Sequence, residues 1–266
     1  MSETHTPSAK TTVFEGHGPE VRERTKKMLM YFILFAVIML FSGFTSAYIV
    51  SSSGQFWVDL QPTTWFWISN LLIIASSVMM WLSVKSLKQG RASAGAIYLG
   101  LVFVLGLGFA GAQLKSWSDL QDLGMGWSID MTDEGIRAYR WSDLGTVLDG
   151  AGVYGEDYVI KRDEQTLQLD AASKKLYAAD DLLQAEDLRS RVSNMTNSAG
   201  SYIAIMVFMH LLHLLLGLAY VVVTLFRLMG GSIHKGDTLK LRTCGIYWHF
   251  LGGLWLYLFA FLFLIF

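Results

Sequence analysis

Five long runs of the sequence contain no Asp, Glu, Lys or Arg, at residues 28–50, 65–84, 94–114, 199–226 and 244–266. A helix of about 20 apolar residues, rising about 1.5 Å per residue, crosses the roughly 30 Å of hydrocarbon in a bilayer. Every run is long enough to do so. The pattern therefore predicts an all-α membrane protein, a bundle of five transmembrane helices.

A polar segment between the third and fourth runs predicts a small external α+β insertion. Residues 115–198 hold 16 acidic and 9 basic residues, a net charge of about −7. Polar and apolar residues alternate from Trp127 to Thr132, which predicts a strand, and glycines from Gly145 to Gly155 predict turns. A spacing of three and four residues predicts one face of an amphipathic helix at Leu169, Ala172, Leu176, Ala179 and Leu183.

These elements divide the chain into four parts. We expect an inner N-terminal arm at residues 1–27, transmembrane helices one to three at 28–117, an external inserted domain at 118–198, and transmembrane helices four and five at 199–266. The arm is polar and lacks the apolar core of a cleavable signal peptide. The first run is therefore expected to be a retained signal anchor.

The distribution of basic residues predicts the orientation, because Lys and Arg in short loops favour the cytoplasmic side of a membrane. Residues 51–64 contain no basic residue, whereas the other short segments contain Lys10, Arg22, Arg24, Lys26, Lys27, Lys85, Lys88, Arg91, Arg227, Lys235, Lys240 and Arg242. We therefore predict a multi-pass protein of the bacterial cytoplasmic (inner) membrane, with its N-terminus inside and its C-terminus outside.

Composition narrows the function classes. The chain is 53% hydrophobic and 16% charged, with a mean hydropathy of +0.39, which is outside the range of ordinary soluble domains. Its 21 Lys and Arg balance 22 Asp and Glu, so nothing favours a nucleic-acid partner. Cys244 is the single cysteine, which excludes an internal disulfide and Cys-based zinc or iron-sulfur sites within this chain.

The predicted spans carry few groups that could perform chemistry. Transporters and proton pumps bury ionisable residues in their helices, but these spans contain no carboxylate, Lys or Arg, and their polar residues are Asn70, Ser76, Ser77, Gln113, His210, His213 and His249. We expect these residues to form hydrogen bonds between helices. Small residues four apart, such as Gly106 and Ala110, predict close helix packing.

The histidines leave one alternative open, a stand-alone haem-binding membrane redox protein. His210 and His213 lie three residues apart on one face of the fourth span, and His249 lies near the start of the fifth. Counted from the inner ends of the two predicted spans, His213 lies about 20 Å deep and His249 about 8 Å deep. This difference argues against the two imidazoles as axial ligands of one iron. A small-molecule transporter is a third alternative, and it would need a polar pathway that the spans do not offer.

Two motifs on the last two spans resemble a known family. The segment from His210 through His213 to Gly217 resembles the HxxHxxxG signature of subunit III of haem-copper (cytochrome c) oxidases. Tyr247-Trp248-His249-Phe250, with the following Trp255-Leu256, resembles the terminal YWHF-plus-WL pattern of that family. Weaker similarity covers residues 62–77 and 113–117. The chain is thus similar to a five-span variant of this subunit.

The resemblance implies an accessory subunit without a redox centre. Such a subunit packs on catalytic subunit I and the other oxidase subunits, binds phospholipid and sustains proton uptake, while the complex reduces dioxygen to water and pumps protons. Haem and copper would reside on partner subunits, and the resemblance implies no catalytic, cofactor-binding or metal-ligating residue in this chain. The electron donor, cytochrome c or quinol, stays open.

The chain departs from the family pattern at several positions. Val37 occupies a position that is usually acidic, Ser116 stands where an acidic residue often precedes the aromatic residue, and Leu251 begins a segment that is often Val-Asp. The long inserted segment is not explained by the resemblance. We expect it to cap the bundle or to dock a partner, such as a basic electron carrier or a further respiratory complex.

Specific roles are expected for the motif residues and the nearby basic residues. We expect His210, His213 and His249 to be structural hydrogen-bonding residues and Trp248 to lie at the membrane boundary or against lipid. We expect Arg227, Lys240 and Arg242 to contact anionic headgroups on the inner side. The alternative for each is plain packing or a solvated charge. The motifs add Gly217, Tyr247 and Trp255 as structural or lipid-contact candidates.

Overall fold

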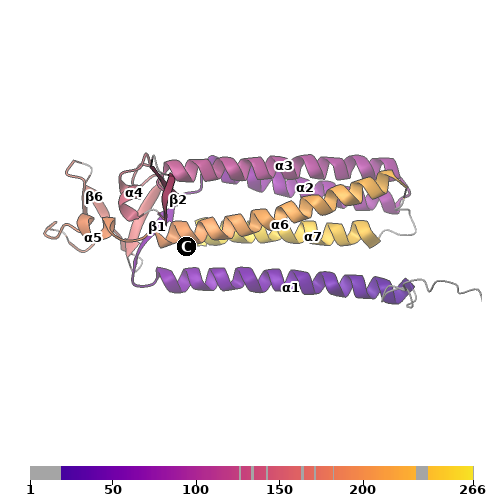
Figure 1. Ribbon diagram of the computed structural model, residues 1–266, viewed down its shortest axis with the longest axis horizontal. Helices are drawn as coiled ribbons and strands as arrows, with labels where there is room; N and C mark the ends of the chain where they lie inside the picture. Colours follow the sequence, from indigo (N-terminus) through magenta and orange to yellow (C-terminus); the bar gives the residue numbers. More distant parts are fainter. Residues whose placement is uncertain are drawn as a thin grey trace, which may run out of the picture.

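Five long helices make up most of the molecule (Figure 1). The computed structural model describes residues 19–125, 127–132, 135–141, 143–162, 165–170, 172–181, 183–231 and 239–265. Within these ranges, five helices are long and apolar enough to span a membrane. They are α1 (Pro19–Ser52), α2 (Thr64–Lys88), α3 (Ala92–Asp122), α6 (Ser198–Met229) and α7 (Leu239–Ala260), the last continued by a π-helical turn, η1 (Phe261–Ile265). The predicted helical membrane fold is confirmed.

The helices extend beyond the apolar runs because polar residues complete their terminal turns. α1 begins at Pro19 and so includes the end of the predicted arm, whose first 18 residues lie outside the described ranges. Lys85 and Lys88 lie in the last turn of α2, where cations interact favourably with the helix dipole. Gly90 then adopts a φ of 81°, a left-handed conformation that favours glycine, and the chain returns as α3.

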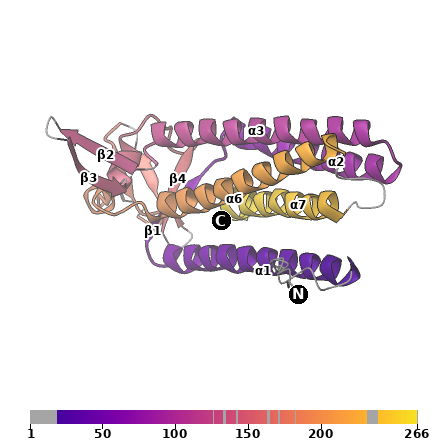
Figure 2. The ribbon, with the colours of Figure 1, turned by 45° about the vertical axis from the view of Figure 1, so that its right-hand side comes forward.

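The helices form two packed pairs and one peripheral member. α2 and α3 pack side by side as a hairpin, and α6 and α7 lie between this hairpin and α1 (Figures 1 and 2). α1 contacts the bundle through one face, which includes Phe41 and Tyr48. Its opposite face carries exposed apolar side chains, among them Phe32, Phe35 and Met39, as expected for a surface that meets lipid or another helix.

A small domain, here called the end domain, covers one end of the bundle. It consists of β1 (Phe56–Leu60), from the connection between α1 and α2, and the segment between α3 and α6. The elements of that segment are β2 (Trp127–Thr132), β3 (Gly135–Trp141), α4 (Leu144–Leu148), β4 (Tyr158–Arg162), β5 (Gln165–Thr166), β6 (Gln168–Asp170), β7 (Lys175–Tyr177) and α5 (Arg189–Ser193).

The strands form one three-stranded antiparallel sheet and two hairpins. The sheet has the order β1-β4-β5, with Val58 opposite Ile160, and the hairpins are β2-β3 and β6-β7. Val58 and Ile160 are fully buried. β1 thus joins the insertion to the connection between the first two helices.

Two predictions for the insertion are partly or wholly wrong. The strand at Trp127–Thr132 is confirmed as β2, but Gly145 lies in helix α4 instead of a turn. The amphipathic helix predicted through Leu169, Leu176 and Leu183 is absent, because residues 168–170 and 175–177 pair as the β6-β7 hairpin. Leu176 is buried and Leu183 is 90% exposed, so these leucines do not share one buried face.

Candidate functional site

The motif residues of α6 and α7 meet in the interior of the bundle. His210 is buried, and its Nε2 donates a hydrogen bond to the Leu251 carbonyl oxygen, 3.1 Å away. The ring of His210 lies edge-on to Phe109 of α3, with 5.9 Å between ring centroids, and 5.2 Å from the ring of Trp255. This histidine therefore links α6 to α7 through a hydrogen bond and packs against α3.

Two tryptophans fasten α7 to α2. The Trp248 Nε1 donates to Ser76 Oγ at 3.0 Å, and the Trp255 Nε1 donates to Asn70 Oδ1 at 2.8 Å. Both indoles are buried. Trp248 therefore lies inside the bundle, and the expectation that it lies at the membrane boundary or against lipid is wrong.

A third polar contact joins α3 to α2. Gln113 Nε2 donates to Ser69 Oγ at 2.9 Å, and Ser69 in turn donates to the Phe66 carbonyl within α2. Asn70, Ser76 and Gln113 thus form hydrogen bonds between helices, as the sequence predicts. In hydrocarbon, where water does not compete, such bonds fix helix register.

Two glycines allow the motif side chains to fit. A Cβ atom on Gly217 would lie 2.9 Å from Leu251 Cδ1, and one on Gly106 would lie 2.7 Å from Leu218 and 2.8 Å from Trp248. Glycine at these positions lets α6, α7 and α3 approach one another closely. Gly217 of the HxxHxxxG motif is therefore a packing residue.

His213 and Tyr247 lie on the side of α6 and α7 that faces α1. His213 Nδ1 donates to the Met209 carbonyl one turn earlier, and its ring packs edge-on against Phe41 of α1, 5.9 Å between centroids. The Tyr247 hydroxyl donates to the His213 carbonyl at 3.3 Å. These residues thus hold the interface between α1 and the last two helices.

His249 lies at the depth of His213 but on a different face. The contacts Tyr220 to Thr243 and His210 to Leu251 set the register of the antiparallel helices α6 and α7, and this register brings His213 and His249 level. The predicted difference in depth is wrong, because the inner ends of the two charge-free runs, Phe226 and Cys244, do not lie level. In this register Cys244 lies opposite the turn of α6 that contains Tyr220. His249 instead borders a groove between α2 and α7, so the two imidazoles do not face each other.

The described residues contain no group of three or more His, Cys, Asp or Glu side chains arranged to hold a metal ion. His210 and His213 each bind a main-chain carbonyl through one ring nitrogen. The arrangement of these side chains serves helix packing.

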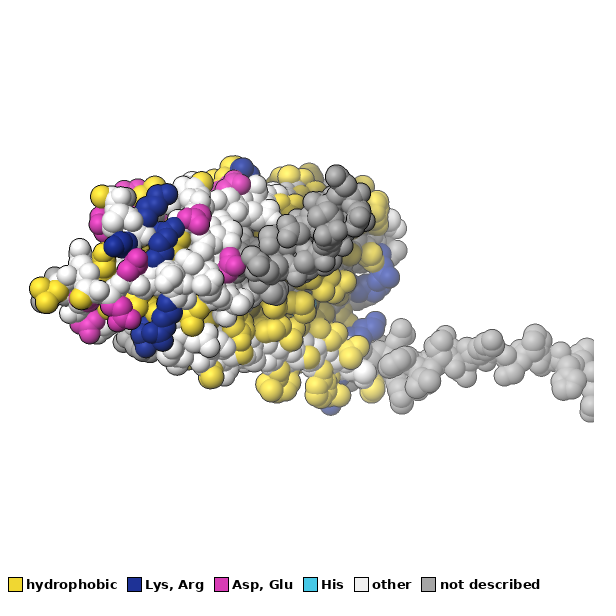
Figure 3. Space-filling view, turned by 60° about the vertical axis from the view of Figure 1, so that its left-hand side comes forward, with side chains coloured by type: hydrophobic (Ala, Val, Ile, Leu, Met, Phe, Trp, Pro, Cys, Tyr) yellow, Lys and Arg dark blue, Asp and Glu magenta, His cyan; other side chains and the backbone are white. Residues whose placement is uncertain are grey.

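Lys and Arg side chains lie at the end of the bundle opposite the end domain, as well as on the end domain itself (Figure 3). Arg227 lies in the last turn of α6, and Lys240 and Arg242 lie in the first turn of α7. Arg227 and Arg242 are exposed. Lys10, Lys235 and the side chain of Arg22 lie outside the described residues.

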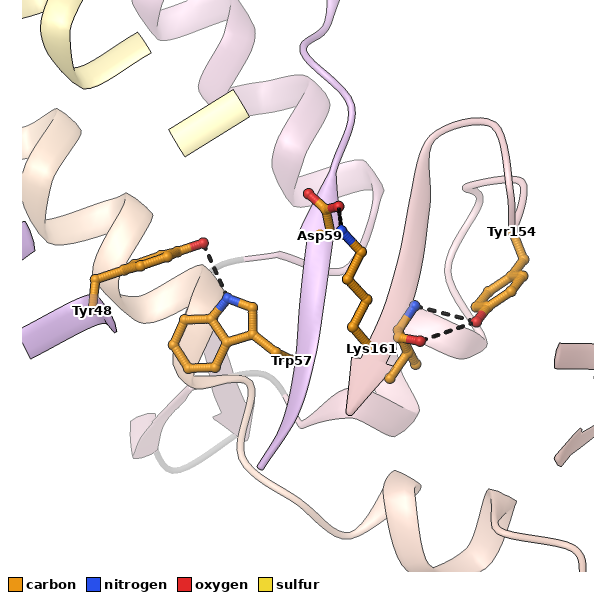
Figure 4. Close-up of polar contacts among 6 residues, drawn as sticks. Tyr48, Trp57, Asp59, Tyr154 and Lys161 are labelled. Atoms are coloured by element: carbon orange, nitrogen blue, oxygen red, sulfur yellow. Dashed lines mark hydrogen bonds and ion pairs between the residues drawn. The ribbon is translucent and has the colours of Figure 1, made fainter. Parts of the chain in front are cut away.

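The junction between the end domain and the bundle was not predicted from the sequence (Figure 4). Trp57 of β1 donates through Nε1 to the Tyr48 hydroxyl of α1 at 3.0 Å, and the two rings meet edge-on. Asp59 of β1 forms an ion pair with Lys161 of β4. The apolar and aromatic run Phe56-Trp57-Val58 was the available signal for a strand here.

A tyrosine pair stabilises the far side of the same sheet. The Tyr154 hydroxyl accepts from the Ile160 amide at 3.2 Å and donates to the Leu167 carbonyl at 2.8 Å. The Tyr158 hydroxyl donates to the Val147 carbonyl at 3.0 Å. Burial raises the pKa of Tyr154, and burial with the nearby Tyr154 raises the pKa of Tyr158 to about 12.

The C-terminal part of the chain is similar to a known family. Residues 162–265, which include α6, α7 and both motifs, match the family model of cytochrome c oxidase subunit III. A search of curated protein sequences found no match.

Proposed function

We propose that this chain, whose residues 162–265 match the family model of cytochrome c oxidase subunit III, is the accessory subunit III of a proton-pumping terminal oxidase that reduces dioxygen to water. In this role it stabilises catalytic subunit I, binds phospholipid and sustains proton uptake. Haem and copper reside on partner subunits. The complex belongs to the aerobic respiratory chain of a bacterial inner membrane.

The observation that supports the proposal most directly is that the motif side chains form hydrogen bonds within the bundle. Their polar side chains bind groups of neighbouring helices in this chain: His210 binds the Leu251 carbonyl, Trp248 binds Ser76, and Trp255 binds Asn70. A subunit that acts through its shape needs such a rigid bundle. The exposed apolar face of α1, with Phe32 and Phe35, is a surface for a neighbouring subunit or for lipid.

The position of the basic residues supports the orientation within the complex. Lys85, Lys88, Arg227 and Arg242 lie in terminal turns of α2, α6 and α7, at the end of the bundle opposite the end domain. The positive-inside rule places this end in the cytoplasm, where these side chains bind anionic headgroups. The end domain then lies outside, where a basic electron carrier or another respiratory complex would reach the segment 115–198, whose net charge is about −7.

Co-purification from native membranes tests the function. The tagged chain is isolated in mild detergent, its visible spectrum is recorded, and the co-purifying subunits are identified. We expect a haem- and copper-bearing catalytic subunit, and no haem on this chain after the partner is removed. Recovery of the chain alone with a Soret band would contradict the proposal and favour a haem-binding redox protein. His210→Leu and His213→Leu variants would then show which histidine binds the haem.

A further inference from the structure

A groove between α2 and α7 lies outside the packing contacts described above. Its volume is about 560 Å³, and its wall includes Ile73, Ser77, Trp81, His249, Gly252 and Gly253. Sites for cofactors and other small molecules typically have volumes of about 300–1,000 Å³. One side chain of a neighbouring helix would fill only a fraction of this groove, so its size favours a separate molecule.

Two polar side chains in this groove have no hydrogen-bond partner in the described part of the chain. Among the described residues, none forms a hydrogen bond with the His249 ring or with the Ser77 hydroxyl. Ser77 Oγ lies 3.3 Å from the position that a Cβ on Gly252 would occupy, so it is directed toward α7. Imidazole is rare on a lipid-exposed surface, and where it occurs within a span it marks a functional site.

Both groups lie inside the hydrocarbon layer. His249 is five residues from Cys244, where the charge-free part of α7 begins, and Ser77 is seven residues from Val84, where that of α2 ends. These ends lie at the same side of the bundle, so at about 1.5 Å per residue the two groups lie roughly 8 Å and roughly 11 Å inside the layer. The occupant must therefore present a hydrogen-bond acceptor within the hydrocarbon layer.

This depth discriminates between classes of occupant. The polar parts of a phospholipid lie at the membrane surface, so an acyl tail in the groove would leave both His249 and Ser77 without a partner. A carboxylate or phosphate at this depth would bear a large desolvation cost. An uncharged molecule with carbonyl acceptors and a long apolar tail would fit this groove, because its tail can pack on the apolar wall and its carbonyl can accept hydrogen bonds from His249 and Ser77.

We infer that the groove binds an isoprenoid quinone, with His249 and Ser77 donating hydrogen bonds to a ring carbonyl. Gly253 leaves room for a flat ring, since a Cβ on this residue would have no atom within 4 Å. Ile73 and Trp81 contact the apolar parts of the molecule. The inference concerns binding by this chain and does not depend on its assembly into an oxidase.

Photolabelling of the full chain, in the complex with which it co-purifies, tests the inference. The probe is a short-chain azido-ubiquinone, and labelled peptides are identified by mass spectrometry. We expect label within residues 73–81 or 249–256, displaced by unlabelled quinone but not by phosphatidylglycerol. We expect His249→Phe and Ser77→Ala to weaken the competition about three- to tenfold, the effect of losing one hydrogen bond. His249→Gln retains a hydrogen-bond donor, and we expect this variant to show the same competition by unlabelled quinone as the wild type.

Controls separate loss of binding from loss of structure. Ser46→Ala removes a hydroxyl on the exposed face of α1 and is expected to leave labelling unchanged, and every variant must retain its co-purifying subunits. Uniform labelling of all spans would overturn the inference, as would displacement by phosphatidylglycerol at equal concentration. A cross-link from this groove to the helix of another subunit, with no competition by quinone, would show that a partner helix occupies it.

Discussion

Trp255 and Asn70 join the last helix to the second through a hydrogen bond of 2.8 Å between two buried side chains that are 185 residues apart. The indole N–H is a donor only, and Asn70 Oδ1 accepts it. Because no water competes at this depth, either group alone would be left unsatisfied. The pair therefore fixes how α7 is rotated against α2.

Removal of one partner of this pair should weaken the bundle. We expect Trp255→Phe to lower the free energy of unfolding in detergent by about 1–3 kcal/mol, because it leaves Asn70 Oδ1 buried without a donor and opens a small cavity. A double-mutant cycle with Asn70→Leu should give a coupling energy of about 1 kcal/mol. Additive effects of the two substitutions would show that the hydrogen bond contributes nothing.

Two glycines of α3 should respond differently to the same substitution. At Gly106 the added methyl group of Gly106→Ala would meet Trp248 and Leu218, whereas at Gly111 nothing lies within 4 Å. We expect Gly106→Ala to destabilise the bundle by about 1–3 kcal/mol, the usual cost of overpacking, and Gly111→Ala to have no such cost. Thermal unfolding of both variants in the same detergent measures the difference. Equal effects would contradict the close approach of α3 to α7.

The end domain should lose stability at alkaline pH through Tyr158. Its pKa is raised to about 12, so the neutral phenol is favoured in the folded state. The resulting stabilisation is complete below the unfolded value near pH 10 and is lost as the pH rises through the folded value.

Proteolysis of the end domain at increasing pH measures this effect. Tyr158→Phe should be less stable at neutral pH by about 1 kcal/mol, because the bond to the Val147 carbonyl is lost. Its susceptibility to protease should rise less steeply than that of the wild type between about pH 10 and about pH 12. Parallel profiles would exclude Tyr158 as the titrating group.

At the junction, apolar burial should outweigh charge. Trp57 is 6% exposed, and Trp57→Ala should destabilise the attachment of the end domain by about 3–5 kcal/mol. The side chains of Asp59 and Lys161 are partly exposed, and Lys161→Met should cost at most about 1 kcal/mol. Limited proteolysis between α3 and α6 reports both effects. A larger loss from Lys161→Met than from Trp57→Ala would reverse this order.

The sequence predicts the helices well because one force dominates in them. Long apolar runs without charge are stable inside the membrane. There the backbone must satisfy its own hydrogen bonds, and a single segment can do so only as a helix. The interhelix partners of Asn70, Ser76 and Gln113 follow from the same scarcity of water, although their identities, such as Trp248 for Ser76, depend on packing. The depth of His249 relative to His213 could not be predicted, because contacts such as Tyr220 to Thr243 set the register of α6 against α7, and composition does not show this register.

The insertion was less predictable because its strands depend on distant pairing. Leu169 and Leu176 have helical spacing, but Leu176 is buried opposite Leu169 in a hairpin, and tertiary contacts override the local period. β1 was missed for a related reason, since Phe56–Leu60 is stable as a strand only beside β4.

The pairing of β1 with β4 also sets an order of events during synthesis. Asp59 and Lys161 are 102 residues apart, so β1 leaves the ribosome well before its partner and must wait while α2 and α3 are inserted. The end domain can complete its sheet only after the chain has returned to the side where β1 lies. For that interval Phe56 and Trp57 lack their buried environment, and a chaperone or the lipid surface would have to shield them. Maturation of this subunit is therefore most vulnerable to aggregation and proteolysis between insertion of its second and fourth membrane helices.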